Sequence, residues 1–553
     1  ALPICDDKQS DRPGPSWLRC CHAPFGIAPL SPPRAANWFR PHRRRLLVPR
    51  RLVAAAPTND PAAKLGFAWT TKLLWDHVLD VTSVAGAGEF WDARIEAAQT
   101  ALAAKGGGVL FFPAGTYRLK DDLKLRSGIV LRGAEPTGAP AASDEKFSPP
   151  SKLEFPRYVP TFTGSGTPKE TAFKGIVLAE PASAANCGVV HLDLNHGYIN
   201  LPETEDHQCG ANRLVLGCVV RNAAGVMAEV PSAKDNQPAW LRYTHKFRAA
   251  IRVHASEHAL IANNRIPRSG EANFVMKDYP LEDRAKKLVP FDLLFDYDNR
   301  PGIYLNHHCV GGAGGSGNDG TPETHPWGFR KGFACVDNYV FATGRCAIGF
   351  CGDGVVCSRN VIRFPKDFPR PTVTGTKASY GSATNDNRAM EMRGWRWVVE
   401  NNDYEVFSNV CSDGKYRIND GEGLMHEDHC NSTIVDSRLV GNRGNSYLSL
   451  FHVGAIDGLH VEGNDITSGH ISAIYVCAAR HKQPGDFPIR RVTIVKNTTR
   501  GQGIRVQGWP SEKVVVKDNR HVGDQPAALL NDCPSAELAN NTNYEVKQTP
   551  VKK

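Results

Sequence analysis

The sequence predicts an all-β protein: a single-stranded, right-handed parallel β-helix of about ten rungs, with an N-terminal capping helix and long loop insertions. Three observations lead to this prediction. Short apolar stretches with alternating side chains recur along the chain, and an asparagine follows most of them. Helix-type periodicity is scarce, whereas Gly (51) and Pro (38) are abundant. The chain of 553 residues is 41% hydrophobic, which is enough to bury a continuous core and excludes a disordered protein.

The charge of the chain lies mainly at its N-terminal end. Residues 1–56 hold ten Lys and Arg against three Asp, so they carry +7 of the net charge of +9, and the other 497 residues carry only +2. A nearly neutral body does not predict a surface for nucleic acid. No stretch reaches the roughly 18 apolar residues of a membrane-spanning helix. The sequence therefore predicts neither nucleic acid nor a membrane span.

Residues 1–56 differ from the rest of the chain because they are rich in Pro and Arg and lack an amphipathic pattern. They end in Ala54, Ala55 and Ala56, which are small residues of the kind that a signal peptidase accepts. We interpret the segment as a basic leader or tail, either targeting or disordered. A secreted or periplasmic protein is the corresponding expectation.

One repeat organises the body of the chain: two apolar residues at alternate positions, two further residues, and then Asn, as in Val355-x-Cys357-x-x-Asn360. The predicted marker positions are Asn264, Asn338, Asn360, Asn402, Ser437 as a variant, Asn464, Asn497, Asn519 and Asn541. The shortest spacing is 22 residues, for example from Asn338 to Asn360. Alternation sends the apolar side chains into one core, and asparagine amides at a bend can stack from rung to rung.

An antiparallel sandwich is the alternative architecture, but it would not explain an Asn after each strand. We therefore assign residues 109–545 to the β-helix, with insertions at about 134–180 and 267–330, after an N-terminal segment at 57–108 and before a C-terminal tail at 546–553.

The 15 cysteines are an odd number without zinc-finger spacing. Cys335 and Cys357 occupy equivalent inward positions, so we expect a buried stack of thiols, with a disulfide as a second option.

The start of the body carries a family resemblance. Trp91 to Lys105 form an amphipathic pattern that Gly106-Gly107-Gly108 ends, and Phe112-Pro113-Ala114-Gly115-Thr116-Tyr117 and Leu131-Arg132-Gly133 follow. These stretches resemble the opening of the pectate-lyase-like (pectin-lyase fold) superfamily of right-handed parallel β-helix proteins. The resemblance implies a polysaccharide-active protein with a polysaccharide substrate as its partner: a lyase, glycoside hydrolase, epimerase or phage-type tailspike. Family members often have Gly-Asp-Gly before this helix, whereas this chain has Ala85-Gly86-Ala87-Gly88-Glu89.

A second repeat precedes the markers: small, apolar, x, apolar, x, small. Because strand side chains alternate, the x positions point outward and form two files of residues along one sheet. One file holds Arg252, Glu391, Met425, Tyr475 and Arg505, and the other holds His254, Arg393, Glu427, Cys477 and Gln507. In the resembled superfamily, substrate lies in a groove along such a sheet. The predicted substrate-binding residues are Arg252, His254, Arg393, Tyr475 and Arg505.

Two carboxylates are the candidate catalytic pair. Glu391 and Glu427 lie on consecutive rungs in different files, and diagonal neighbours on a sheet are roughly 7–8 Å apart, within the range of inverting glycosidases. Asp420 and Glu422 precede the same strand and are alternatives. We predict a glycoside hydrolase that uses these carboxylates without a cofactor or metal. A purely structural Arg–Glu pair between Arg393 and the glutamates is the competing interpretation.

Two other functions stay open at this point. A polysaccharide lyase would abstract a proton next to a uronate, with a base such as His254 or Tyr475 and a neutralising group such as Arg393, Arg505 or Ca²⁺. The chain lacks an evident stack of three carboxylates for that ion. A non-catalytic glycan-binding or adhesion β-helix would not need Glu391 and Glu427.

Overall fold

The computed structural model describes most of the chain after residue 59. The described ranges are 60–86, 88–138, 143–157, 174–223, 249–268, 302–307, 325–341, 346–364, 388–410, 422–426, 433–469, 472–478 and 487–548, with the short pieces 274–275, 294–295, 322–323 and 417–420. The chain divides into two units, residues 1–57 and 58–553, and everything described here belongs to the second.

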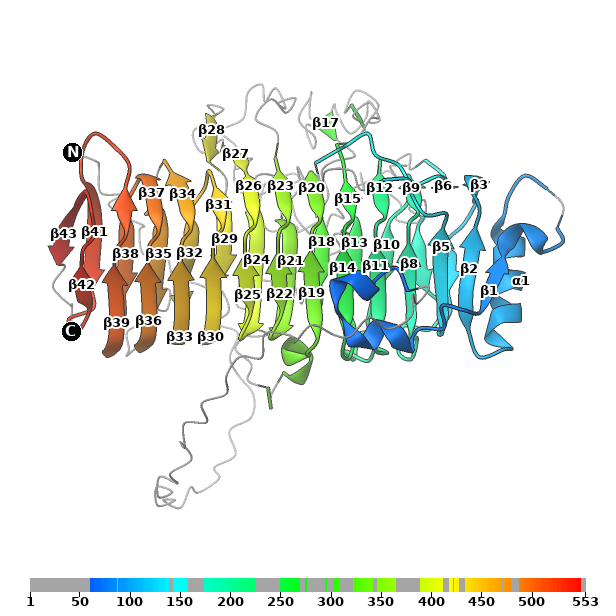
Figure 1. Ribbon diagram of the computed structural model, residues 1–553, viewed down its shortest axis with the longest axis horizontal. Helices are drawn as coiled ribbons and strands as arrows, with labels where there is room; N and C mark the ends of the chain where they lie inside the picture. Colours follow the sequence, from blue (N-terminus) through cyan, green and yellow to red (C-terminus); the bar gives the residue numbers. More distant parts are fainter. Residues whose placement is uncertain are drawn as a thin grey trace, which may run out of the picture. The chain divides into compact units, whose positions relative to one another are not determined.

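Three long parallel sheets build this unit (Figure 1). Sheet 1 has 14 strands: β1 (Val78–Asp80), β2 (Gly108–Phe112), β5 (Ile129–Gly133), β8 (Cys187–Val190), β11 (Arg213–Leu216), β14 (Ala259–Ala262), β19 (Phe333–Val336), β22 (Val356–Ser358), β25 (Val398–Glu400), β30 (Thr433–Val440), β33 (Ala455–Glu462), β36 (Ile489–Val495), β39 (Ser511–Lys517) and β42 (Glu537–Ala539). Sheet 2 has 12 strands: β3 (Gly115–Arg118), β6 (Ser151–Glu154), β9 (Asp193–Asn195), β12 (Val219–Arg221), β15 (Arg265–Ile266), β20 (Tyr339–Phe341), β23 (Val361–Arg363), β26 (Asp403–Glu405), β31 (Arg443–Gly444), β34 (Asp465–Ser468), β37 (Thr498–Gly501) and β40 (Arg520–His521). Sheet 3 has 13 strands: β4 (Leu123–Leu125), β7 (Ile176–Leu178), β10 (Ile199–Leu201), β13 (Ile251–Val253), β18 (Ile303–Leu305), β21 (Cys346–Asp353), β24 (Arg388–Trp395), β29 (Glu422–His426), β32 (Leu448–Val453), β35 (Ile474–Ala478), β38 (Ile504–Gln507), β41 (Ala527–Asp532) and β43 (Tyr544–Gln548).

The chain visits the three sheets in turn, so that β2, β3 and β4 make one rung and β5, β6 and β7 the next. Each strand pairs in parallel with its equivalent on the following rung, as Val109 does with Val130. Interior strands thereby have no unpaired edges. Two small antiparallel pairs stand apart from the rungs: β16 (Phe274–Val275) with β17 (Leu294–Phe295), and β27 (Phe407–Val410) with β28 (Arg417–Asp420).

This architecture confirms the predicted all-β, parallel β-helix and agrees with the resemblance to the pectate-lyase-like superfamily. The predicted insertions are not pure loops, because 134–180 contains β6 and β7 and 267–330 contains β18. Residues 546–548 of the predicted tail belong to β43. These strands have three to five residues and lack a marker asparagine, so the repeat pattern could not reveal them.

The predicted asparagine stack is confirmed as a continuous ladder. Its members are Asn264, Asn338, Asn360, Asn402, Asn442, Asn464, Asn497, Asn519 and Asn541, and each Nδ2 donates to Oδ1 of the next at 2.9 to 3.0 Å. The variant marker Ser437 was wrong, because Ser437 lies inside β30 opposite Leu459. Leu439-x-x-Asn442 carries the same pattern five residues later, and Asn442 occupies the bend.

The core lies between the three sheets and ends at helix α1 (Asp92–Ala103), which matches the amphipathic stretch in the sequence. Ile95, Ala98 and Leu102 of this helix belong to the same buried cluster as the strands. The described residues also include the short 3-10 helices η1 (Ala63–Leu65), η2 (Ala68–Lys72), η3 (Val81–Ser83) and η8 (Pro326–Phe329). Cys335 and Cys357 are register partners, both buried and both free thiols, so the thiol stack is confirmed and no disulfide joins them. Burial, with Cys335 as neighbour, raises the pKa of the Cys357 thiol well above its ordinary value.

Candidate functional site

The register of sheet 3 brings the predicted outward residues into one file. Reading across neighbouring strands from β13 to β38, the file is Arg252, Tyr304, Gly349, Glu391, Met425, Ser449, Tyr475 and Arg505. The sequence interpretation had five of these eight residues in this order. It missed Tyr304, Gly349 and Ser449, because β18, β21 and β32 were not recognised.

The predicted acidic residues are only partly described. Glu427 lies outside the described residues. The side chains of Asp420 and Glu422 also lie outside them, although both backbones are placed. Glu422 opens β29 opposite Arg388 of β24, and Asp420 ends β28 in the small antiparallel pair. Strands β24 and β29 are neighbours, as the prediction of consecutive rungs requires.

Glu391 is the centre of a buried charged cluster on the outward face of sheet 3. Its side chain is 0% exposed and lies against Arg388, at 3.4 Å, and Arg393, both on its own strand. The Nε2 atom of His307 lies 3.2 Å from Glu391 Oε1. Burial by itself would raise the pKa of Glu391, but Arg393, His307 and Arg388 together hold it well below its ordinary value. Glu391 is therefore ionised at neutral pH.

A glycine makes room for the histidine of this cluster. Gly349 lies in the file between Tyr304 and Glu391, and a Cβ at this position would lie 2.6 Å from Cδ2 of His307. Because this space is empty, the ring of His307, which follows β18, extends across β21 toward β24. The same ring stacks on Tyr304, with 4.5 Å between ring centroids.

A second acidic residue, Glu203, anchors a neighbouring cluster. Its Oε1 accepts a hydrogen bond from Nδ1 of His207 at 2.9 Å and lies 3.0 Å from Nδ1 of His254, while Arg330 donates to its Oε2 at 2.6 Å. On the other side of the imidazole, Arg252 donates from Nε to Nε2 of His254 at 3.2 Å. Because Nε2 accepts this bond, the proton of His254 is assigned to Nδ1, facing Glu203, and the ring is neutral.

Asn306 connects the two clusters. Its Oδ1 accepts from Arg330 at 3.1 Å, and its Nδ2 donates to the carbonyl oxygens of Trp327 and Cys351 at 2.9 and 3.1 Å. Asn306 is followed directly by His307, which faces Glu391. Acids, imidazoles and guanidinium groups thus form one fixed network over β13, β18, β21 and β24. Such a network can position a sugar, transfer protons and neutralise an anionic group.

Tyr475 and Arg505 form a separate, more accessible part of the same face. The guanidinium of Arg505 lies over the Tyr475 ring, 5.3 Å from its centroid, and donates to Gln507 at 2.9 Å. Burial raises the pKa of Tyr475 far above its ordinary value, so its hydroxyl keeps its proton at neutral pH and is a poor base. Strands β29 and β32 separate this pair from Glu391. Tyr475 and Arg505 therefore form a pair of their own on this face, apart from the Glu391 cluster.

Glu203, Asn306, Arg330 and Arg388 are site residues that the sequence interpretation missed, and His307 lies within the insertion predicted at about 267–330. Glu203, His254 and His307 each follow a strand of sheet 3 (β10, β13 and β18) by one or two residues. Equivalent ends of parallel strands meet at one edge of a sheet. If these strands had been recognised in the sequence, the polar residues directly after them would have indicated the site.

Within the described ranges, no group of three or more His, Cys, Asp or Glu side chains is placed to hold a metal ion. The optional Ca²⁺ of a lyase stays a prediction. No helix among the described residues is long and apolar enough to cross a membrane.

No protein-family model matches the sequence, and no curated protein matches it. Solved structures do align with most of the chain. The surface adhesin PfbA of Streptococcus pneumoniae covers 86% of this chain and 93% of its own length at 12% identity and a TM-score of 0.41. DFA-IIIase from Arthrobacter chlorophenolicus A6, in complex with GF2, covers 84% and 93% at 13% identity and a TM-score of 0.39. The A-module of the mannuronan C-5 epimerase AlgE4 of Azotobacter vinelandii covers 85% and 100% at 11% identity and a TM-score of 0.30.

Proposed function

We propose that the protein is a polysaccharide-degrading enzyme that cleaves glycosidic bonds on the outward face of sheet 3, and that it is a glycoside hydrolase. The observation that carries this proposal is the ionised Glu391, fixed between Arg388, Arg393 and His307 in one file with Arg252, Tyr475 and Arg505. The proposal places the polysaccharide substrate outside the cell, so it includes a secreted or periplasmic location for the protein.

In this mechanism the two carboxylates have different roles. Glu391, which is ionised at neutral pH before the reaction, accepts a proton from water as the water oxygen attacks the anomeric carbon. Glu427 gives its proton to the glycosidic oxygen as the carbon–oxygen bond breaks, with Asp420 or Glu422 as alternatives. A water molecule reaches Glu391 by displacing one of the three side chains that now contact its carboxylate. Arg388 is the natural one, because its contact of 3.4 Å is the longest of the three.

The second candidate is a lyase, favoured by the Arg252–His254–Glu203 arrangement. A neutral His254 can take the proton next to a uronate carboxylate through Nε2 once Arg252 turns to that carboxylate. The leaving sugar oxygen then departs as a carbon–carbon double bond forms. Ca²⁺ could share the neutralising role. A glycan-binding β-helix without catalysis is the third possibility and requires neither His254 nor Glu391.

A polysaccharide panel separates these functions. We expect wild-type protein to release reducing ends without absorbance of unsaturated uronates, and Glu427→Gln to lose at least 100-fold in rate because the leaving oxygen is no longer protonated. Glu512→Gln, an exposed carboxylate on sheet 1, is the control with unchanged rate. Unsaturated product that His254→Gln abolishes would establish the lyase instead. Binding without any product would establish the non-catalytic protein.

The pH dependence tests the assignment of Glu391 as base. Because Arg393 lowers the pKa of Glu391, the acid limb of the pH profile of kcat/KM should have an apparent pKa below the ordinary glutamate value of 4.5. Arg393→Gln raises this pKa, so its acid limb should move to higher pH. Arg396→Gln, which loses only the outer pair with Asp353, should leave the limb in place. An unmoved limb in Arg393→Gln, with the protein folded, would contradict the assignment.

A further inference from the structure

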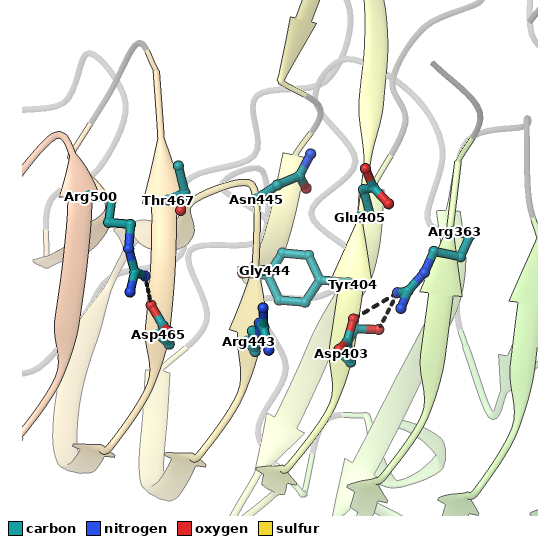
Figure 2. Close-up of a pocket in the computed structure, with 10 residues that line it drawn as sticks. All are labelled: Arg363, Asp403, Tyr404, Glu405, Arg443, Gly444, Asn445, Asp465, Thr467 and Arg500. Atoms are coloured by element: carbon teal, nitrogen blue, oxygen red, sulfur yellow. Dashed lines mark hydrogen bonds and ion pairs between the residues drawn. The ribbon is translucent and has the colours of Figure 1, made fainter. Parts of the chain in front are cut away.

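A pocket of about 550 Å³ lies on sheet 2, away from the Glu391 cluster of sheet 3 (Figure 2). Five consecutive strands, β23, β26, β31, β34 and β37, contribute to it. At about 4.8 Å per strand, it extends over roughly 19 Å of the sheet surface. We call it the sheet 2 pocket.

Charges of alternating sign line the sheet 2 pocket. Register places Arg443 between Asp403 and Asp465 on neighbouring strands. Arg363 pairs with Asp403 at 2.8 Å, and Arg500 pairs with Asp465, so both outer arginines turn toward an aspartate (Figure 2). The order across the five strands is therefore Arg, Asp, Arg, Asp, Arg.

Two charged side chains that line the pocket do not take part in these ion pairs. Arg443 and Glu405 are both exposed, and neither has an ion-pair partner within the part of the chain that the structure describes. Glu405 brings the lining to three carboxylates against three arginines, a formal charge of zero. Exposed ion pairs stabilise a fold by only about 0–1 kcal/mol, and Arg443 and Glu405 do not form even such a pair. Their arrangement is better explained by a ligand than by stability.

The floor of the pocket is kept open. Gly444 lies so close to the Tyr404 ring that a Cβ would be 2.0 Å from its carbon atoms, so no larger residue fits here. Asn445 does not fill the space above, because its amide is bound to the backbone of Val406, with Oδ1 accepting at 2.8 Å and Nδ2 donating at 3.0 Å. Thr467, which also lines the pocket, is small and exposed.

We propose that the sheet 2 pocket binds a neutral sugar unit of a glycan chain. Vicinal hydroxyls can donate to Glu405 and accept from Arg443 at the same time, and charge-assisted bonds of this kind are the strong ones. A lining with zero net charge gives no advantage to an anionic sugar, which would meet three carboxylates. The choice of a glycan among polyhydroxylated ligands rests on the proposed function. The pocket would hold the polymer while another face of the β-helix cleaves it.

Calorimetric titration of the full chain tests this proposal. The protein carries Glu391→Gln so that ligand is not consumed, and the probes are cellohexaose, xylohexaose, mannohexaose and, as the charged comparison, hexagalacturonate. We expect at least one neutral hexasaccharide to bind, and Arg443→Gln and Glu405→Gln each to weaken this binding at least 10-fold. Arg520→Gln, an exposed arginine on β40 outside the pocket, should change it less than twofold. Melting temperatures confirm that each variant is folded.

Three results would overturn the inference: no neutral probe binds, hexagalacturonate binds the pocket most tightly, or binding survives both pocket variants. Binding that is lost in His254→Gln but kept in Arg443→Gln belongs to sheet 3, so it would overturn this inference and leave the proposed function intact. Binding that depends on Arg443 in a protein that cleaves no polymer would support the pocket, although the proposed function had failed.

Discussion

Glu391→Gln is expected to lower kcat by about 10²- to 10⁴-fold, the range of a lost general base. The amide has the shape of the carboxylate but cannot take a proton from water. Glutamine also keeps an oxygen for Arg393 and His307, which both lie at Oε1, and gives up only the 3.4 Å contact of Oε2 with Arg388, so most of the cluster stays assembled. Rates on the best polymer of the panel, with melting temperatures of the same samples, measure this effect.

Two further variants make the Glu391 result interpretable. Glu391→Ala leaves two arginines and a histidine buried without their anion, so it should also cost about 3–5 kcal/mol of stability. Glu462→Gln is the matched control, because Glu462 also lies between cations, Lys496 at 2.8 Å and His460 at 2.7 Å, but on sheet 1. It should keep full activity. A Glu391→Gln protein that is folded and retains more than a tenth of the wild-type kcat would exclude Glu391 as the base.

Asn402→Leu is expected to destabilise the β-helix by about 3–6 kcal/mol. In the wild type, Oδ1 of Asn402 accepts from the backbone N and from Nδ2 of Asn360, both at 2.9 Å. Its Nδ2 donates to the carbonyl of Cys357 at 3.0 Å and to Asn442 at 2.9 Å. Leucine has a similar volume but satisfies none of these buried groups, and each unsatisfied group costs about 1–3 kcal/mol. Denaturant unfolding measures the loss.

Asn540→Ala is the control for Asn402→Leu. Asn540 also lies at a bend beside the ladder but is exposed, and its amide reaches only Asp518 at 3.1 Å. Because Asn540 has a φ of 52°, which alanine adopts less readily, its replacement should cost about 1–2 kcal/mol, still below the loss in Asn402→Leu. If Asn402→Leu were as mild as Asn540→Ala, the ladder would be a consequence of the fold and not a source of its stability.

The fold was predictable because its signal is local and repeated. Most rungs place apolar pairs and an Asn at fixed offsets, so sequence spacing alone predicted all but Asn442 of the ladder and five of the eight residues in the file from Arg252 to Arg505. The Ser437 error shows the limit of this reasoning. Two candidate markers five residues apart, Ser437 and Asn442, fit the pattern, and only the pairing of β30 with β33 decides between them.

The site was less predictable, because its residues meet through folding and not through spacing. Arg330 meets Glu203 from a distant part of the chain, and nothing periodic marks these residues or the nearby His207. The sheet 2 pocket did leave a trace, since Asp403, Arg443 and Asp465 each follow a marker asparagine directly. A marker that ends one strand also sets the register of the next, so these positions could have been aligned as a third file.

The asparagine ladder has a direction. The Nδ2 atoms of Asn264 to Asn519 each donate to the asparagine of the following rung, so these eight amide dipoles add head to tail inside the protein. The backbone N of Cys218 meets the negative end at Asn264, 2.9 Å from its Oδ1. Aligned hydrogen bonds in a low-dielectric interior polarise one another, so the central bonds are stronger than the terminal ones. The row of side chains therefore has the electrostatic character of a helix, a polarity that a parallel sheet of this length otherwise lacks.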